Sequence, residues 1–192
     1  MPQFDLRGIK VAKYVNTSGS ISYTGGTSIG DAMSVDITMK YAEGRLYAES
    51  TLAEYMRKIT GGTISIAEKY IPENAQKLMF GSREGSRTVS SKQIKGLKIG
   101  AKDESANVGV AFYCPDMVDG NLKYTCVFIP RCLFGLPSMS YQTQGENISF
   151  NTPTCTGEFM ADHSSTQEML ETAVCDDEAT AIAWVNAVLS IT

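Results

Sequence analysis

The clearest pattern in the chain lies at residues 32–40, AMSVDITMK, where apolar and polar side chains alternate with a period of two. Successive side chains of an extended strand point to opposite faces of a sheet. One face of this segment carries Met33, Val35, Ile37 and Met39, and the other carries Ser34, Asp36, Thr38 and Lys40. The pattern predicts a strand with one dry face and one wet face, suited to separating two environments.

Similar extended runs recur along most of the chain. We expect them at residues 9–15, 20–23, 45–49, 63–70, 107–114, 121–129 and 147–150. We expect a charged turn between residues 40 and 45, further turns at Gly25-Gly26, Gly61-Gly62 and Asp119-Gly120, and a break at Pro130. This spacing predicts a mainly β fold, either a sandwich or an open barrel.

Two helical stretches are expected beside this β pattern. The first covers 72–80, PENAQKLMF, with proline in its first turn and Gly81 as its stop. Ser165 and Glu168 match a capping box, and residues 176–178 begin an amphipathic run around Trp184. We therefore expect a β domain over residues 1–162, flanked by the first helix, and a C-terminal helical segment over 163–192 docked on the same domain.

Length and composition indicate one globular domain. The chain has 192 residues, of which 43% are apolar and 20% charged, and its formal net charge is -4. No run approaches the roughly 20 apolar residues of a membrane span, and the first 15 residues lack the features of a secretory signal. We therefore expect no membrane partner and a chain that stays in the compartment where it is made.

The five cysteines form no CxxC pair, and their number is odd. This usage is typical of reduced thiols that pack as small apolar groups. We expect neither a disulfide nor a zinc site. The carboxylates at 103–104 and 176–178 are interpreted as a solvated loop and a helix start, so no metal ion is expected.

One glycine pair has the spacing of a phosphate-binding loop. Gly25 and Gly30 match that loop, but Asp31 stands where lysine is required and would repel a phosphate. The segment is better interpreted as a hairpin turn.

The single histidine, His163, is the other candidate for chemistry. It cannot form a triad with Asp162 and Ser164, because adjacent side chains point in different directions. A distant partner such as Cys155 stays conceivable, but no nucleophile motif of the GxSxG kind is present. We expect no catalytic, cofactor-binding or metal-ligating residue, and no enzymatic role.

Residues 81–102 are locally basic and rich in serine and glycine, which predicts a long exposed loop or arm. Its cations are Arg83, Arg87, Lys92, Lys95, Lys98 and Lys102. The arm is either simply solvated or binds a partner with an acidic surface. A protein partner is favoured over nucleic acid, because no aromatic side chains are interleaved for base stacking.

An ordered set of segments resembles one family, the major tail tube proteins of long non-contractile-tailed (siphovirus-type) bacteriophages. The segments are GIKVAKYVN, IGDAMSVDITMKYAEGRLYAES, GGTISIAEKYIPENAQKLMFG, VGVAFYCPD, KYTCVFIPRC and SYQTQGENISFNTPTCTGEFM. The matching order covers nearly the whole chain. It is weakest over residues 81–102 and after Asp162.

The resemblance implies a structural virion protein with a β-sandwich flanked by a helix. Such subunits form hexameric rings whose inward sheets join into one barrel, and the rings stack into the tail tube, the conduit for genome DNA during ejection. It also implies assembly in the bacterial host cytoplasm, contacts with tape-measure, tail-terminator and tail-tip proteins, and DNA that passes through the lumen without specific binding.

Elementary geometry agrees with assembly from several copies. Barrels of 16 to 18 strands leave only a solute channel, so a lumen for duplex DNA needs more strands than 192 residues supply. On this interpretation, Asp36 points to the lumen or to solvent, and residues 41–62 and 81–102 make ring-to-ring contacts. A secretion-system tube protein, a tail-completion ring protein and a monomeric β-sandwich binding module are the alternatives.

Overall fold

The computed structural model describes residues 5–138, 143 and 152–191, most of which belong to antiparallel strands. The main sheet has eight strands in the order β2-β1-β7-β8-β9-β4-β3, with β10 paired to β8. These strands are β1 (Arg7–Thr17), β2 (Ser20–Ser28), β3 (Ala32–Ala48), β4 (Thr51–Glu68), β7 (Asn107–Val118), β8 (Asn121–Phe134), β9 (Thr154–Phe159) and β10 (Glu171–Cys175). A separate hairpin pairs β5 (Arg83–Val89) with β6 (Lys92–Lys98). The predicted mainly β fold, a sandwich or open barrel, is confirmed.

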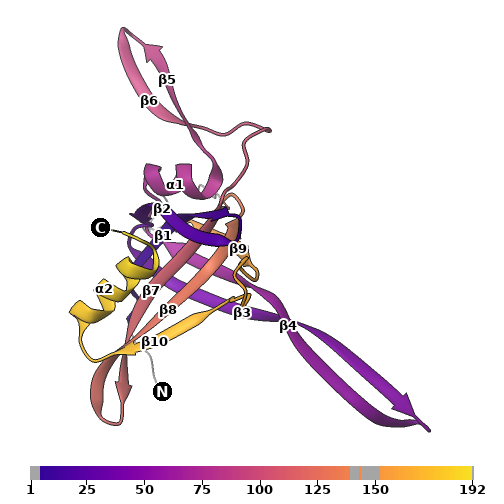
Figure 1. Ribbon diagram of the computed structural model, residues 1–192. Coiled ribbons are helices and arrows are strands. Elements are labelled where there is room, and N and C mark those ends of the chain that lie inside the picture. Colours follow the sequence, from indigo (N-terminus) through magenta and orange to yellow (C-terminus); the bar gives the residue numbers. More distant parts are fainter. Residues whose placement is uncertain (1–4, 139–142, 144–151, 192) are drawn as a thin grey trace.

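Two long hairpins project from the body of the molecule (Figure 1). The distal part of β3–β4 extends in one direction, and β5–β6 extends from the end where helix α1 (Glu73–Phe80) lies. Helix α2 (Glu178–Val188) lies along the body beside β7 and β8. The body therefore holds the core, and the hairpins lie largely outside it.

The strands at the centre of the sheet are buried on both faces. Along β7, Val110 packs in the larger core together with α1, whereas its neighbour Ala111 packs in a second core under α2. This explains why VGVAFYC reads as a continuous apolar run, since a strand covered on both sides does not alternate. The second core is made by Ala12, Ala111, Tyr113, Cys126, Phe128, Cys175, Ala181, Val185 and Leu189.

Both helices begin and end close to where the sequence predicts. Helix α1 follows Pro72 and ends at Gly81, whose φ of 67° is left-handed. A Cβ at Gly81 would lie 2.3 Å from the backbone oxygen of Glu104, so this position requires glycine. Helix α2 is capped by Asp177, which accepts a hydrogen bond of 2.8 Å from the Thr180 backbone N–H.

The expected charged turn between residues 40 and 45 is wrong, because β3 runs without interruption through this segment. Residues 41–48 pair with residues 51–59, which the sequence pattern does not assign to a strand. The turn lies at Glu49 and Ser50, which both have positive φ, at 50° and 66°. The two predicted runs at 32–40 and 45–49 are therefore one strand of 17 residues.

Two expected glycine turns and the proline break are also wrong. Gly25-Gly26 lies inside β2 at a shift in its register with β1, and Gly61-Gly62 lies inside β4 next to a shift in its register with β3. Pro130 lies inside β8 at a third such shift. Glycine and proline mark β-bulges at these positions, and a bulge interrupts the ladder without ending the strand. The turn at Asp119-Gly120 is confirmed.

The C-terminal segment differs from the prediction in one element. Ser165 and Glu168 lie in a loop, and strand β10 follows them, so the expected capping box is wrong. A different residue organises this loop, because Asp162 accepts hydrogen bonds from the backbone N–H groups of Ser164 and Glu168. The expected strand at 147–150 lies outside the described residues.

Candidate assembly surfaces

The wet face predicted for residues 32–40 is present and continues over two neighbouring strands. Register places Asp36 beside Ser65 of β4 and Ser65 beside Thr156 of β9, so the three side chains share one face. The face consists of Ser34, Asp36, Thr38 and Lys40 from β3, Thr63, Ser65 and Ala67 from β4, and Thr154, Thr156 and Glu158 from β9. It is a hydroxyl-rich surface with few charges.

Lys40 is the only cation among the ten residues of this face. Its Nζ lies 2.5 Å from the Oε1 of Glu158 in an exposed ion pair. Asp36 is exposed, and the opposite side of β3 carries the partly buried Val35, Ile37 and Met39 against the core. This surface therefore offers no uncompensated positive charge to a polyanion.

Met33 does not follow the predicted alternation. Its side chain is 62% exposed, although the pattern places it on the dry face. The register of β3 with β4 shifts between Ala32 and Ser34, so Met33 occupies a bulge and Ala32 packs against the core in its place. The dry face of β3 begins at Val35.

Strand β3 is also an edge of the main sheet, because it is paired on one side only. Its 17 residues form the last strand next to β4, and β2 forms the edge at the other end of the order. A long edge strand presents unpaired backbone donors and acceptors, which invite pairing with another chain. The wet face therefore ends at an edge to which a further strand can add.

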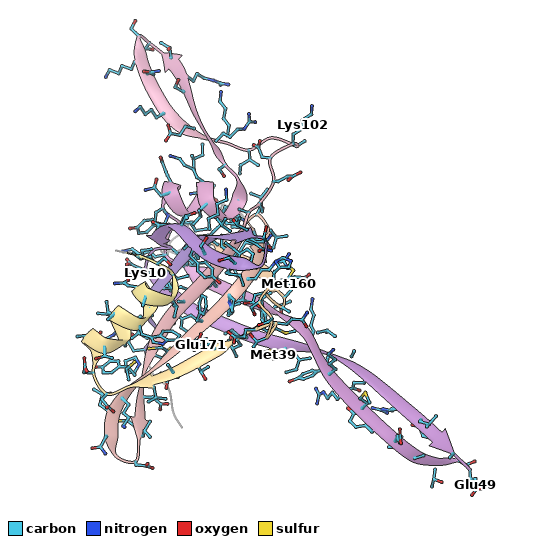
Figure 2. All side chains as sticks on the ribbon, viewed as in Figure 1. Lys10, Met39, Glu49, Lys102, Met160 and Glu171 are labelled. Atoms are coloured by element: carbon cyan, nitrogen blue, oxygen red, sulfur yellow. The ribbon has the colours of Figure 1, made fainter. Side chains whose placement is uncertain are left out.

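The distal β3–β4 hairpin, residues 41–60, consists entirely of exposed residues (Figure 2). Glu49 lies at its tip and Met39 at its base. At about 3.3 Å per residue, the nine residues from 41 to 49 carry the tip about 30 Å beyond the body. No described part of the chain covers either face of this hairpin.

The two faces of the distal hairpin differ in chemistry. On one face, the Arg57 guanidinium lies 3.6 Å from the ring centroid of Tyr41, and both Arg45 and Arg57 pair with Glu43. The pKa of Tyr55 is raised, first of all by a hydrogen bond with Glu43. The other face carries Leu46 and Met56, which are 59% and 74% exposed, together with Lys58 and Glu54. We call the exposed pair Leu46 and Met56 the apolar strip of the distal hairpin.

His163 has a structural environment. Tyr14 Oη lies 3.0 Å from its Nδ1, and the Arg131 guanidinium lies 3.3 Å from its Nε2. Because arginine only donates, Nε2 must accept, which places the imidazole proton on Nδ1. The backbone N–H of His163 also donates to Tyr14 Oη. These contacts tie the 161–168 loop to β1 and β8.

The cysteines are all free, and four of the five are buried. Burial raises the pKa of the Cys155 thiol to about 12, so this candidate nucleophile stays protonated at neutral pH. The sulfur atoms of Cys126 and Cys175 lie 3.7 Å apart in the second core. Within residues 5–138, 143 and 152–191, no group of three or more His, Cys, Asp or Glu side chains is arranged to hold a metal ion.

Glu68, which the sequence does not single out, has an unusual environment. It is the last residue of β4, it is fully buried, and its two carboxylate oxygens find no hydrogen-bond partner among the described residues. Desolvation raises its pKa from 4.5 to about 8. The backbone at Gly30 packs close to this carboxylate, because a Cβ at Gly30 would lie 2.5 Å from the Tyr70 backbone oxygen and 3.6 Å from Glu68 Oε2.

Comparison with known proteins gives no family model that matches this chain and no curated protein that matches it. Among the described residues, no helix has the length and apolar character needed to cross a membrane.

Proposed function

We propose that this chain is the subunit of a phage tail tube, which assembles into hexameric rings that stack around a DNA-conducting lumen. The hydroxyl-rich wet face of β3, β4 and β9 is the observation that carries the proposal. A lumen that lets DNA pass must not bind phosphates, since each lysine or arginine that neutralises a phosphate strengthens binding. On this face, one lysine is present and a glutamate neutralises it.

The free edge of β3 supports ring formation. A strand from a neighbouring copy can pair with the unpaired backbone donors and acceptors of this edge. In a closed cyclic ring every copy makes the same contact, so no such edge stays unpaired. The wet faces of successive copies then continue around one surface, with the dry side of β3 turned to the core of each subunit. The distal β3–β4 hairpin lies outside this core and offers its apolar strip to a further copy.

Negative-stain electron microscopy of the purified protein over a range of concentrations tests the proposal. We expect rings with a central hole and, at high protein concentration, hollow tubes with a regular axial repeat. Rings that never stack would favour a tail-completion ring protein. A protein that stays monomeric at every concentration would overturn the proposal and favour a β-sandwich binding module.

A further inference from the structure

The two faces of the β5–β6 hairpin carry different charge. Residues that are directly opposite in an antiparallel pair share a face. Register pairs Arg83 with Lys98, Gly85 with Gly96, Arg87 with Ile94 and Val89 with Lys92. This face, which we call the cationic face, therefore carries four positive side chains and no carboxylate.

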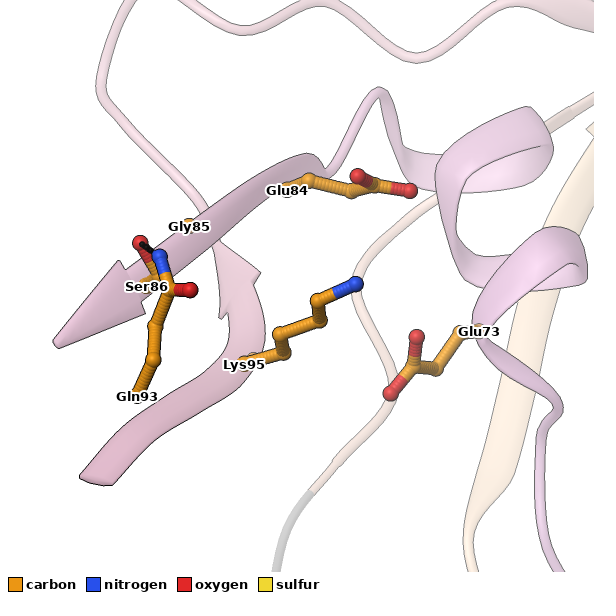
Figure 3. A pocket seen from close by; sticks show the side chains of 7 residues that line it. Glu73, Glu84, Gly85, Ser86, Gln93 and Lys95 are labelled. Carbon is orange, nitrogen blue, oxygen red and sulfur yellow. Dashed lines mark hydrogen bonds between the residues drawn. The ribbon is translucent and has the colours of Figure 1, made fainter.

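The opposite face turns toward α1. Glu84 forms an ion pair with Lys77 of α1, which lowers the pKa of Glu84. The Lys95 side chain extends between Glu84 and Glu73, and the three line an open cleft between the hairpin and the helix (Figure 3). This face therefore carries one charge of each sign, Glu84 and Lys95, and Glu84 is ion-paired to α1.

The cationic face is much less compensated. Arg83 pairs with Asp103 at 2.9 Å, and no ion pair involves Arg87, Lys92 or Lys98 among the described residues. Val89 is 49% and Ile94 56% exposed on the same face. A two-stranded hairpin alone in water is marginally stable, so a solvated arm of this kind gains order from a partner that covers it.

A complementary surface lies at the other end of the same molecule. The β7–β8 turn and the N-terminal end of α2 lie opposite the end that carries β5–β6 (Figure 1). The solvent-accessible carboxylates at this acidic end are Asp119, Asp176, Asp177 and Glu178, and its cations Arg7 and Lys123 pair with Glu178 and Asp176. Carboxylates thus exceed cations at this end.

We propose that the cationic face of β5–β6 in one copy binds the acidic end of the next copy, in a head-to-tail contact between stacked rings. The direction of this contact rests on the proposed function, since the rings set the stacking axis. A contact between two different surfaces of one chain does not close on itself, so it continues from copy to copy. Nucleic acid is the less suitable partner, because residues 83–98 contain no aromatic side chain for base stacking.

Two neutralising variants test the contact. Arg87→Gln with Lys92→Gln removes charge from the cationic face, and Asp119→Asn with Asp176→Asn removes it from the acidic end. Lys13→Gln with Lys95→Gln is the control, because it removes two exposed charges outside both surfaces. We expect each test variant to form rings but to lose at least tenfold in tube mass at fixed protein concentration, and the control to stack like the original chain. Unfolding curves establish that all variants are folded.

Mixing the two test variants gives the decisive measurement. Each variant retains one intact surface of the contact, so a ring of one variant can bind a ring of the other. The mixture should therefore form pairs of rings but no stacks of more than two rings. Tubes of normal length from the cationic-face variant would overturn the inference and leave the proposed function standing. If the original chain forms no tubes, the proposed function fails. Sedimentation of the mixture then still tests the contact, because it detects complexes between the two variants. Loss of binding to a short DNA duplex, with stacking unchanged, would identify nucleic acid as the partner and overturn the inference.

Discussion

Glu68 carries the clearest prediction at the scale of one residue. Its carboxyl group is protonated in the folded state up to about pH 8, whereas it ionises near pH 4.5 when the chain unfolds. The folded state therefore binds more protons between these values, and stability falls as pH rises from about 4.5 to 8, by at most about 1.4 kcal/mol per pH unit. Above pH 8 this contribution is constant.

Chemical denaturation at pH 5 and pH 8 measures this effect. We expect Glu68→Gln to lower the pH dependence and to be more stable than the original chain at pH 8, because an amide cannot ionise. Glu104→Gln serves as the control and should keep the original slope, because Glu104 is exposed and forms no ion pair with another described residue. Equal slopes for Glu68→Gln and the original chain would contradict the assignment.

The sequence predicts which side of β3 is wet, but it does not predict Met33 or Glu68. Asp36 and Thr38 follow the alternation because this part of β3 pairs with β4 without a register shift. Met33 departs from it because a bulge depends on the partner strand, which a period of two along one strand does not report. In the sequence, Glu68 has the character of a polar residue at the end of a strand. Its burial becomes visible only in the folded structure.

At the scale of elements, the sequence predicts both helices and most strands of the body but not the extent of the hairpins. Gly44 and the charges around it resemble a turn, yet this glycine has open space around it and pairs with Met56. The distal hairpin has no core to impose an apolar period, so its pattern is weak. Its turn residues, Glu49 and Ser50, are also not those typical of a two-residue turn.

The apolar strip of the distal β3–β4 hairpin gives a prediction about assembly. Leu46→Ser together with Met56→Ser should change the melting temperature of the monomer by no more than about 2 °C, because both side chains are already exposed. Ring or tube formation should be lost at concentrations where the original chain assembles, since burial of each side chain in a contact contributes about 1.5–3 kcal/mol. Sedimentation velocity and electron microscopy measure the two effects.

A matched pair of exposed apolar residues away from the hairpin is the control. Leu136 is 54% and Val174 60% exposed. Leu136→Ser with Val174→Ser should leave assembly unchanged. If the control and the hairpin variant assemble equally well, the strip is not an interface between copies.

At the scale of the whole molecule, a sheet face acts as a wall only when several copies join. In a single chain the hydroxyl-rich face is one more exposed surface. Its low charge becomes meaningful in a ring, where every side chain is repeated by symmetry and one substitution changes the whole wall. The wall therefore amplifies the effect of a single charge.

Asp36→Lys uses this amplification to test where the wet face points. If the face lines a lumen, each ring gains a circle of positive charge that attracts duplex DNA, and binding should weaken steeply as salt increases because phosphate contacts release counterions. Glu104→Lys makes the same charge change in an exposed loop between β6 and β7. We expect tubes of Asp36→Lys to carry labelled short DNA into the pellet at low salt and release it at high salt, whereas tubes of Glu104→Lys and of the original chain carry much less. Equal DNA binding by the two lysine variants would place Asp36 on the outside of the tube.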